Sequence, residues 1–217
     1  MILDELIIGR TVEGQNMTAH VADGKWNKYF YFLAGVMGDE VEGVYVLQKL
    51  IEEMASNIYF QEFPIVIIPI FNLDGHQRLL PNNSQEVDLY HHFLFQDQYK
   101  KLTPESEALI ELFKKFPPAY CLNFKQGVGR LTYQGEISKA IASHLGKGLG
   151  LDIEKERQSE NNMRLSYYLK NHYQAGTISL YLPINNEQLP LKDIWKYCRE
   201  SMYSLFRNDY IRKICQN

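Results

Sequence analysis

The sequence predicts an α/β fold in which a mixed, twisted sheet lies between helices on both of its faces. Two patterns support this prediction. Residues 64–71 are apolar throughout, as expected for a strand that is buried on both faces. Residues 42–58 instead repeat apolar side chains at helical spacing, and such segments alternate with strand-like runs along the chain. A length of 217 residues suits one fairly large domain, so we expect a single domain over residues 1–217.

The first third of the chain predicts several strands and one helix. Residues 7–10 and 17–21 are typical of two short strands that open the fold. Residues 29–36 predict the first central strand, because they are rich in aromatic and apolar side chains. The helix at 42–58 should cover the sheet, and residues 64–71 predict a strand that is buried on both faces.

The middle of the chain predicts a long loop, a well-capped helix and another strand. Residues 72–88 are polar and show no periodicity, which favours a loop, and long ordered loops are often functional. Thr103 and Pro104 are a typical helix start, with a side-chain cap followed by proline at the first helical position. The two prolines at 117–118 should end that helix, and residues 119–124 predict the strand that follows.

The last third predicts three more helices and one strand. Helical spacing is weak over residues 136–145 and 161–173, which are separated by glycine-rich and charged segments. Residues 177–182 predict a strand. Pro190 should open a final amphipathic helix with one strongly apolar face.

The composition excludes several classes of function. With 23 basic and 26 acidic side chains, the formal net charge of −3 predicts no affinity for nucleic acid or for an anionic membrane. No apolar run approaches the roughly 20 residues that span a bilayer. As the sequence stands it shows no signal peptide, so we expect a cytoplasmic protein, although a removed signal would leave no trace. Cys121, Cys198 and Cys215 lack metal-ligand spacing and are expected to be free thiols.

Residues 30–40 are the first candidate for a functional site. A buried strand ends there in a turn of small residues that carries Asp39 and Glu40, and a helical pattern follows. Open α/β sheets place their sites at the carboxyl ends of strands, where such turns lie. The position is therefore typical of a catalytic or binding site, but Met37 in the same turn is a poor residue for such chemistry.

Six short motifs occur in the order and approximate spacing of one known family. The strongest is GVMGDEVEG at residues 35–43, which is similar to GVHGDEPEG. The others are residues 8–14 for IGxSxEG, 72–75 for NPDG, 87–93 for VDLNRNF, 103–109 for EPETRAL and 180–183 for xELP. On these motifs the chain resembles the zinc carboxypeptidase family over most of its length, particularly its short bacterial branch of murein-peptide amidases and deacylase-like proteins.

The resemblance implies a zinc ion held by two histidines and one glutamate, which activates a water molecule while a separate glutamate moves protons. In this chain Glu40 takes the position of the glutamate ligand. Met37 and Asn123 take the positions of the two histidines. A thioether is a soft, neutral donor and an amide oxygen is a weak one, so only one good zinc ligand of three remains.

Other family positions are also changed. Asp88 matches the carboxylate that orients the first histidine ligand, so this role loses its partner. Tyr90 and His91 replace the Asn-Arg pair that grips a substrate carboxylate, and imidazole lacks the bidentate fork of guanidinium. Tyr181 stands at the position of the catalytic glutamate, where a phenol of pKa about 10 is a poor base. Arg78 matches the arginine that stabilises the developing oxyanion.

Two interpretations of the metal position stay open. Glu40 is either a ligand in a rearranged site with His91 or His92, or a leftover carboxylate in a shallow cleft. Adjacent histidines on a strand point to opposite faces, so His91 and His92 should not share one metal ion. Met37 is better explained by packing than by copper binding.

The aromatic side chains and Arg78 are also open to two interpretations. Tyr90, Tyr181, Tyr167 and Tyr168 either line a cleft that binds a ligand or fill the space of the lost zinc site. Arg78 is either a cleft anchor for an anion or a surface salt-bridge partner.

The sequence therefore predicts a pseudoenzyme that needs no cofactor and binds a peptide or murein-like fragment in the old cleft. The alternative is an active metallo-carboxypeptidase or amidase with zinc in a non-standard site around Glu40. A third interpretation is a binding module whose site lies on the tyrosine-rich surface or on the last helix.

Overall fold

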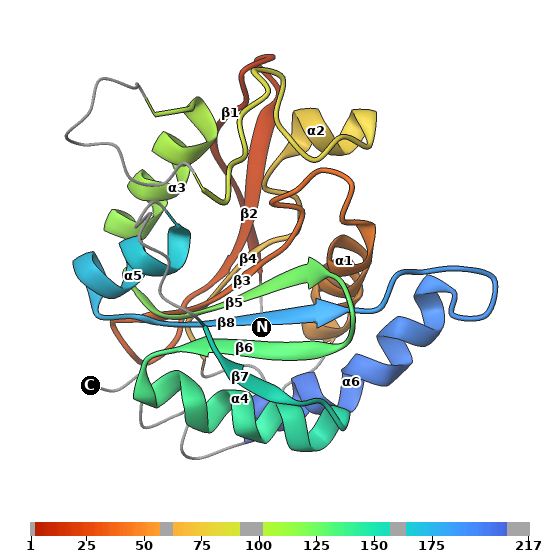
Figure 1. The fold of residues 1–217 in the computed structure, drawn as a ribbon. Helices are drawn as coiled ribbons and strands as arrows, with labels where there is room; N and C mark the ends of the chain where they lie inside the picture. Colours follow the sequence, from red (N-terminus) through yellow and green to blue (C-terminus); the bar gives the residue numbers. More distant parts are fainter. Residues whose placement is uncertain (1–2, 57–62, 92–101, 157–163, 208–217) are drawn as a thin grey trace.

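The computed structural model describes residues 3–56, 63–91, 102–156 and 164–207 (Figure 1). In chain order the elements within these ranges are β1 (Asp4–Arg10), β2 (Asn16–Ala22), β3 (Tyr29–Leu33), α1 (Val41–Ser56), β4 (Ile65–Ile68), α2 (Leu73–Arg78), α3 (Pro104–Lys115), β5 (Pro118–Gln126), β6 (Arg130–Gln134), α4 (Glu136–Leu149), β7 (Ile153–Lys155), α5 (Leu165–Tyr173), β8 (Gly176–Leu182) and α6 (Leu191–Arg207). The helices and strands alternate along much of the chain, as the sequence predicts.

One mixed sheet organises the fold. Its strand order is β1-β2-β4-β3-β5-β8-β6-β7. The four central strands β4, β3, β5 and β8 are parallel, and β2 and β6 pair antiparallel to them on either side. The carboxyl ends of the central strands therefore meet at one edge of the sheet, where sites of open α/β proteins form.

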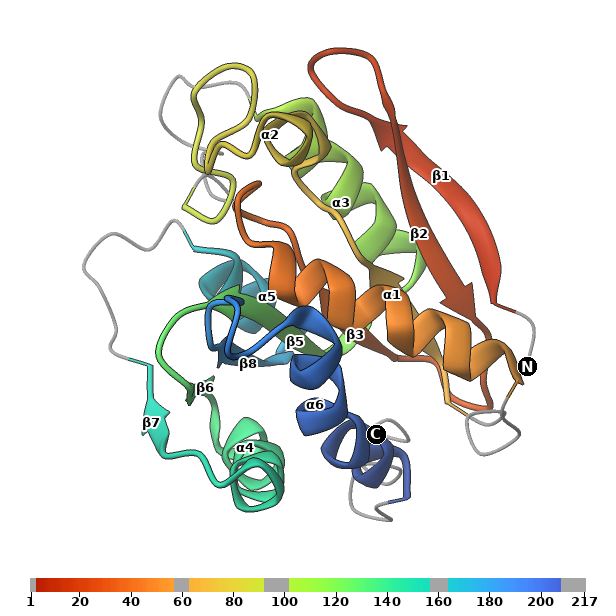
Figure 2. The same ribbon diagram turned by 90° about the vertical axis from the view of Figure 1, so that its right-hand side faces the viewer.

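Helices cover both faces of the sheet, which confirms the predicted fold class. Alternate side chains of β3 enter two separate cores because successive strand residues point to opposite faces. Phe30 and Phe32 pack with α1, α4 and α6, whereas Tyr31 and Leu33 pack with α3 and α5. Figure 2 shows α1 and α6 toward the viewer, with the central strands and then α3 and α5 behind them.

The predicted start of α3 is confirmed. Thr103 is the N-cap, and its hydroxyl oxygen accepts a hydrogen bond from the backbone N–H of Ser106 at 3.2 Å. Pro104 is the first helical residue, where its missing N–H costs nothing. Phe116 follows the helix as its C-cap, immediately before the two prolines.

The prediction of an unbroken loop over residues 72–88 is wrong, because α2 lies within it. The Asn72 side chain caps this short helix by accepting from the N–H of Gly75 at 3.0 Å. The helix ends at Arg78, and its C-cap residue Leu79 has a left-handed φ of 52°. Six residues are too few for apolar periodicity to indicate a helix. The hydrogen bond from the Gly75 N–H to the Asn72 side chain stabilises the start of this helix instead.

Two smaller differences concern the strands, and the prediction of free cysteines is confirmed for two of the three. The central strand predicted over residues 29–36 ends at Leu33, and the last two strands of the sheet, β6 and β7, were not predicted. Cys121 and Cys198 are free and buried, whereas Cys215 lies outside the described residues. Within the described ranges, no helix is long and apolar enough to cross a membrane.

Candidate functional site

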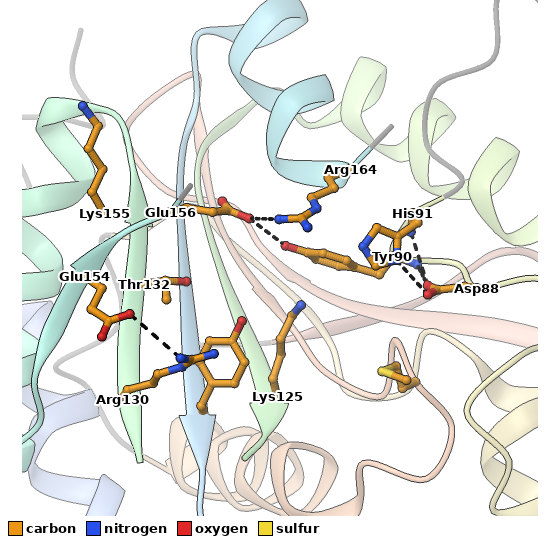
Figure 3. A pocket seen from close by; sticks show the side chains of 12 residues that line it. Asp88, Tyr90, His91, Lys125, Arg130, Thr132, Glu154, Lys155, Glu156 and Arg164 are labelled. Carbon is orange, nitrogen blue, oxygen red and sulfur yellow. Dashed lines mark hydrogen bonds and ion pairs between the residues drawn. The ribbon is translucent and has the colours of Figure 1, made fainter. Parts of the chain in front are cut away.

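A cleft of about 680 Å³ opens at the carboxyl ends of the central strands. Its lining comes from the turn after β3, the segment after α2, the ends of β5 and β8, and from β6, β7 and the start of α5 (Figure 3). Pockets of this size hold small-molecule ligands. The cleft lies where the sequence places the candidate site.

Three neighbouring strands place a row of cationic and aromatic side chains along the cleft. Lys125 on β5 is the register partner of Tyr181 on β8, and Tyr181 is also paired with Arg130 on β6. Register partners carry their side chains on the same face of a sheet. The two cations therefore flank one phenol ring, and their charged groups lie 5.7 Å (Lys125) and 4.6 Å (Arg130) from its centroid.

A second, polar row lies two residues further into the sheet. Asn123 on β5 is paired with Ser179 on β8, which is paired with Thr132 on β6. All three side chains are buried. Asn123 thus lies on the same face as Lys125 but beneath the cleft, since the strand alternates its side chains with a period of two.

Ion pairs connect most of the charged side chains of the cleft (Figure 3). The pairs are Arg164–Glu156 at 3.3 Å, Arg130–Glu154 at 3.9 Å and His91–Asp88 at 2.7 Å. Lys125 and Lys155 also line the cleft. Neither lysine has a carboxylate partner within 4.0 Å in the described part of the chain.

Lys125 is held against an aromatic ring. Its Nζ lies 3.2 Å from the ring centroid of Tyr90, whose hydroxyl donates to Glu156 Oε1 at 3.2 Å. Burial lowers the pKa of Lys125 to about 8, and the nearby carboxylates of Glu40 and Glu156 oppose that shift. Burial also raises the pKa of the Tyr90 hydroxyl, which stays protonated and can act as a hydrogen-bond donor.

Asp88 has gained a new partner. The resemblance predicts that Asp88 loses its role when Met37 replaces a histidine, and Asp88 instead accepts from His91 Nδ1. It also accepts from the backbone N–H groups of Tyr90 and His91. Burial alone would raise the pKa of Asp88, but these hydrogen bonds and the nearby His91 lower it below the usual value.

The three positions that match zinc ligands differ in their environments. Met37 lines the cleft, whereas Glu40 and Asn123 are buried, with exposed fractions of 6% and 4%. Glu40 Oε1 accepts from the backbone N–H of Gln126 at 3.1 Å. Burial raises the pKa of Glu40 to about 7, and the Gln126 hydrogen bond and the Lys125 charge oppose this shift.

These residues do not fit the zinc ion that the family resemblance implies. Zinc in hydrolytic sites is bound by imidazole, thiolate and carboxylate groups, and here a thioether and an amide replace two of them. The Lys125 ammonium adds a positive charge near Glu40. Across the described ranges, no group of three or more His, Cys, Asp or Glu side chains is arranged to hold a metal ion.

The remaining predicted residues divide between the cleft and the surface. Tyr181, Tyr90 and His91 line the cleft. Arg78 lies outside the lining, where its guanidinium pairs with Glu13 at 3.3 Å and its Nε donates to the carbonyl of Asp74. These contacts favour the surface salt bridge over the cleft anchor. Tyr167 and Tyr168 are not among the described lining residues, and His92 lies outside the described ranges.

Sequence reasoning missed most of the charged lining. Arg130, Thr132 and Glu154 come from β6 and β7, which the sequence analysis did not predict. Lys125 had one usable signal. It follows Asn123 by two residues, one residue beyond the predicted strand at 119–124, and because β5 continues to Gln126 that spacing places both side chains on one face.

Glu40→Gln is expected to stabilise the protein at high pH. Because burial raises the folded-state pKa of Glu40 to about 7, folding favours the protonated carboxyl. This stabilisation is complete below about pH 4.5 and is lost as the pH rises through about 7. Glutamine cannot ionise, so the variant should gain about 1–2 kcal/mol of unfolding free energy over wild type near pH 8 and little near pH 4.5.

Urea unfolding followed by circular dichroism at both pH values measures this gain. Glu107→Gln is the control, because Glu107 is exposed on α3. A Glu40→Gln gain that is the same at both pH values would contradict the prediction.

No protein-family model matches this chain. No curated protein sequence matches it either. Solved structures do match. A metallo-carboxypeptidase from Burkholderia cenocepacia aligns with a TM-score of 0.77 at 12% identity, covering 98% of this chain and 65% of the other. Carboxypeptidase A from Helicoverpa armigera aligns with a TM-score of 0.76 at 11% identity, covering 99% and 68%.

Murein-tripeptide amidase MpaA from Escherichia coli O157 aligns with a TM-score of 0.71 at 17% identity, covering 94% of this chain and 92% of the amidase. This chain thus spans about two thirds of the two carboxypeptidases and nearly all of the amidase. At these identities the likeness concerns the fold and not the activity. The chain therefore has the α/β fold of the metallo-carboxypeptidases and of murein-tripeptide amidase.

Proposed function

We propose that this protein is a carboxypeptidase-like pseudoenzyme that has lost zinc binding and peptidase activity and binds a peptide or a peptidoglycan-like fragment in its cleft. The observation that carries the proposal is the donor set at the metal positions. Met37 offers a thioether and Asn123 an amide, and Glu40 is a buried carboxyl whose pKa is raised to about 7. This set is a poor ligand for a hydrolytic zinc ion.

The surroundings of Tyr181 also support loss of catalysis. A phenol stands at the position of the family's general base, in place of the carboxylate that moves protons there. In this chain Arg130 lies 4.6 Å from the centre of its ring. Tyr181 therefore acts as part of the cleft wall.

A peptide-like ligand fits the shape and chemistry of the cleft. Its volume of about 680 Å³ accommodates several residues of an extended chain. Aromatic side chains from β8 and from the segment after α2 supply apolar walls, and charged groups supply polar contacts. One structural neighbour is a murein-tripeptide amidase, which supports a peptide or a murein-like fragment as the ligand.

A second function has one observation in its favour. Glu40 Oε2 and both polar atoms of the Asn123 side chain are buried without a hydrogen-bond partner among the described residues. A bound metal ion would satisfy the two oxygens. This supports an active metallo-carboxypeptidase or amidase with zinc in a non-standard site around Glu40.

Metal analysis of the purified protein separates the two functions. Protein prepared without chelators is expected to hold far less than one equivalent of zinc, and it should not hydrolyse short peptides or murein tripeptide. Binding of the same peptides should persist after treatment with a chelator. About one equivalent of zinc that is lost in Glu40→Ala, together with hydrolysis that a chelator abolishes, would establish the second function instead.

A further inference from the structure

Some of the charged side chains that line the cleft form ion pairs and others do not. Arg164, Arg130 and His91 each have a carboxylate partner. Lys125 has none within 4.0 Å and makes no hydrogen bond through its ammonium group in the described part of the chain. An ammonium group has three donors, and those of Lys125 are at the cleft, where acceptors of a ligand can replace water.

The position of Lys125 makes this group available to a ligand. Its side chain lines the cleft and lies between Tyr90 and Tyr181, 3.2 Å and 5.7 Å from their ring centroids. Figure 3 shows the ammonium directed toward Tyr90 and into the space bordered by Arg164 and Glu156. The ring stabilises the cation through its π-face but accepts none of its three strong hydrogen bonds.

Tyr90 and His91 occupy the positions of the family's Asn-Arg pair, which binds a substrate carboxylate. Both side chains already have partners within the protein. The hydroxyl of Tyr90 donates to Glu156, and His91 Nδ1 bonds Asp88. Neither side chain offers a guanidinium fork. An anionic group that enters the cleft therefore meets two ammonium groups without a carboxylate partner among the described residues, those of Lys125 and Lys155. Of the two, Lys125 is half-buried against aromatic rings, whereas Lys155 is exposed.

We propose that Lys125 is the anion-binding residue of the cleft and that its ammonium receives a carboxylate of the bound peptide, between the rings of Tyr90 and Tyr181. This inference rests on the proposed function and names the chemical group that is recognised. A carboxylate suits a single ammonium because its charge is −1 and its two oxygens accept charge-assisted hydrogen bonds. The carboxylate belongs either to the peptide C-terminus or to an acidic side chain.

Three small probes distinguish these sources. N-acetyl-Ala-Ala has a terminal carboxylate, its C-terminal amide has none, and N-acetyl-Ala-Glu-amide has only a side-chain carboxylate. Each is titrated into the full-length protein and followed by nuclear magnetic resonance. We expect at least one of the two acids to bind about tenfold or more tightly than the neutral amide, because hydrogen bonds to charged groups are the stronger class.

Lys125→Met tests the residue, because methionine keeps much of the apolar stem and removes the charge. It is expected to abolish the preference for the acids, while Lys125→Arg retains much of it. Lys155→Met is the matched control, because it removes the same charge from the same cleft at an exposed lysine. It should leave most of the preference intact, and thermal unfolding verifies that each variant is folded.

The outcomes separate this inference from the proposed function. Equal binding of acids and amide, or a preference that survives in Lys125→Met, would overturn the role of Lys125 and leave peptide binding in place. An equal loss in Lys155→Met would show a general charge effect and would also overturn it. Absence of binding by all three probes and by murein tripeptide would overturn both.

Discussion

The double substitution Met37→His and Asn123→His is expected to create a zinc site at the positions of the family's metal ligands. It places two imidazoles at the positions that the family resemblance assigns to the ligands, beside Glu40. Imidazole and carboxylate are the donors that zinc prefers. We expect zinc affinity to rise by more than about 100-fold, because changes even in the residues that support zinc ligands alter affinity by 10–100-fold.

Isothermal titration with zinc and metal analysis after dialysis measure this gain. Adding Glu40→Gln to the double variant is the matched control and should remove most of the new affinity. Adding Lys125→Met should strengthen binding, because it removes a positive charge that acts on Glu40. A folded double variant that binds zinc no more tightly than wild type would contradict the proposal that these side chains account for the loss.

The same substitution bears on Asp88. In the family this carboxylate orients the first histidine ligand, whereas here His91 Nδ1 occupies it at 2.7 Å. A new histidine at position 37 therefore competes with His91 for Asp88. Under the proposed loss of zinc binding, the supporting carboxylate has changed its partner along with the ligands, so Asp88 is not left without one.

The fold could be predicted from the sequence because its central strands are continuous apolar runs, whereas its helices repeat apolar residues at helical spacing. The apolar run that contains β3 is followed by the helical spacing of α1, and the capping residues Thr103 and Pro104 mark the start of α3. These signals are local. The strands β6 and β7 have five and three residues, which is too short for alternation to stand out.

The site could be predicted only where a motif covers it. Met37, Tyr90 and Tyr181 lie within family motifs and do line the cleft. Lys125 lies in no quoted motif, and its environment depends on register with Tyr181 on β8 and on the distant Tyr90. Contacts between segments far apart in sequence leave no periodic signal in any one segment. The environment of Lys125 could therefore be identified only from the structure.

Glu42 holds three segments around the site together. Its side chain is fully buried at the start of α1. Its Oε1 accepts from the backbone N–H and the side-chain amide of Asn185 at 2.8 Å and 2.9 Å. Gln126 Nε2 donates to both carboxylate oxygens at 3.3 Å. Glu42 therefore links the end of β5 and the segment after β8 to α1.

Glu42→Ala is expected to lower the free energy of unfolding by about 3 kcal/mol, because it removes a buried carboxylate and leaves half-buried donors of Asn185 and Gln126 without an acceptor. Glu42→Gln keeps one acceptor oxygen and should cost less. The control is Glu52→Ala on the same helix, where an exposed carboxylate pairs with Lys49, and there we expect a change within about 0.5 kcal/mol. Urea unfolding measures all three.

Glu42→Ala should disturb the candidate site as well as lower the free energy of unfolding. Gln126 also donates its backbone N–H to Glu40 at 3.1 Å, so releasing its side chain loosens the contact that positions Glu40. In nuclear magnetic resonance spectra, the backbone amide of Gln126 should therefore shift in Glu42→Ala and stay unchanged in Glu52→Ala. If Glu42→Ala costs no more than Glu52→Ala, the buried carboxylate does not stabilise this corner, and packing of α1 against β5 must hold Glu40 in place.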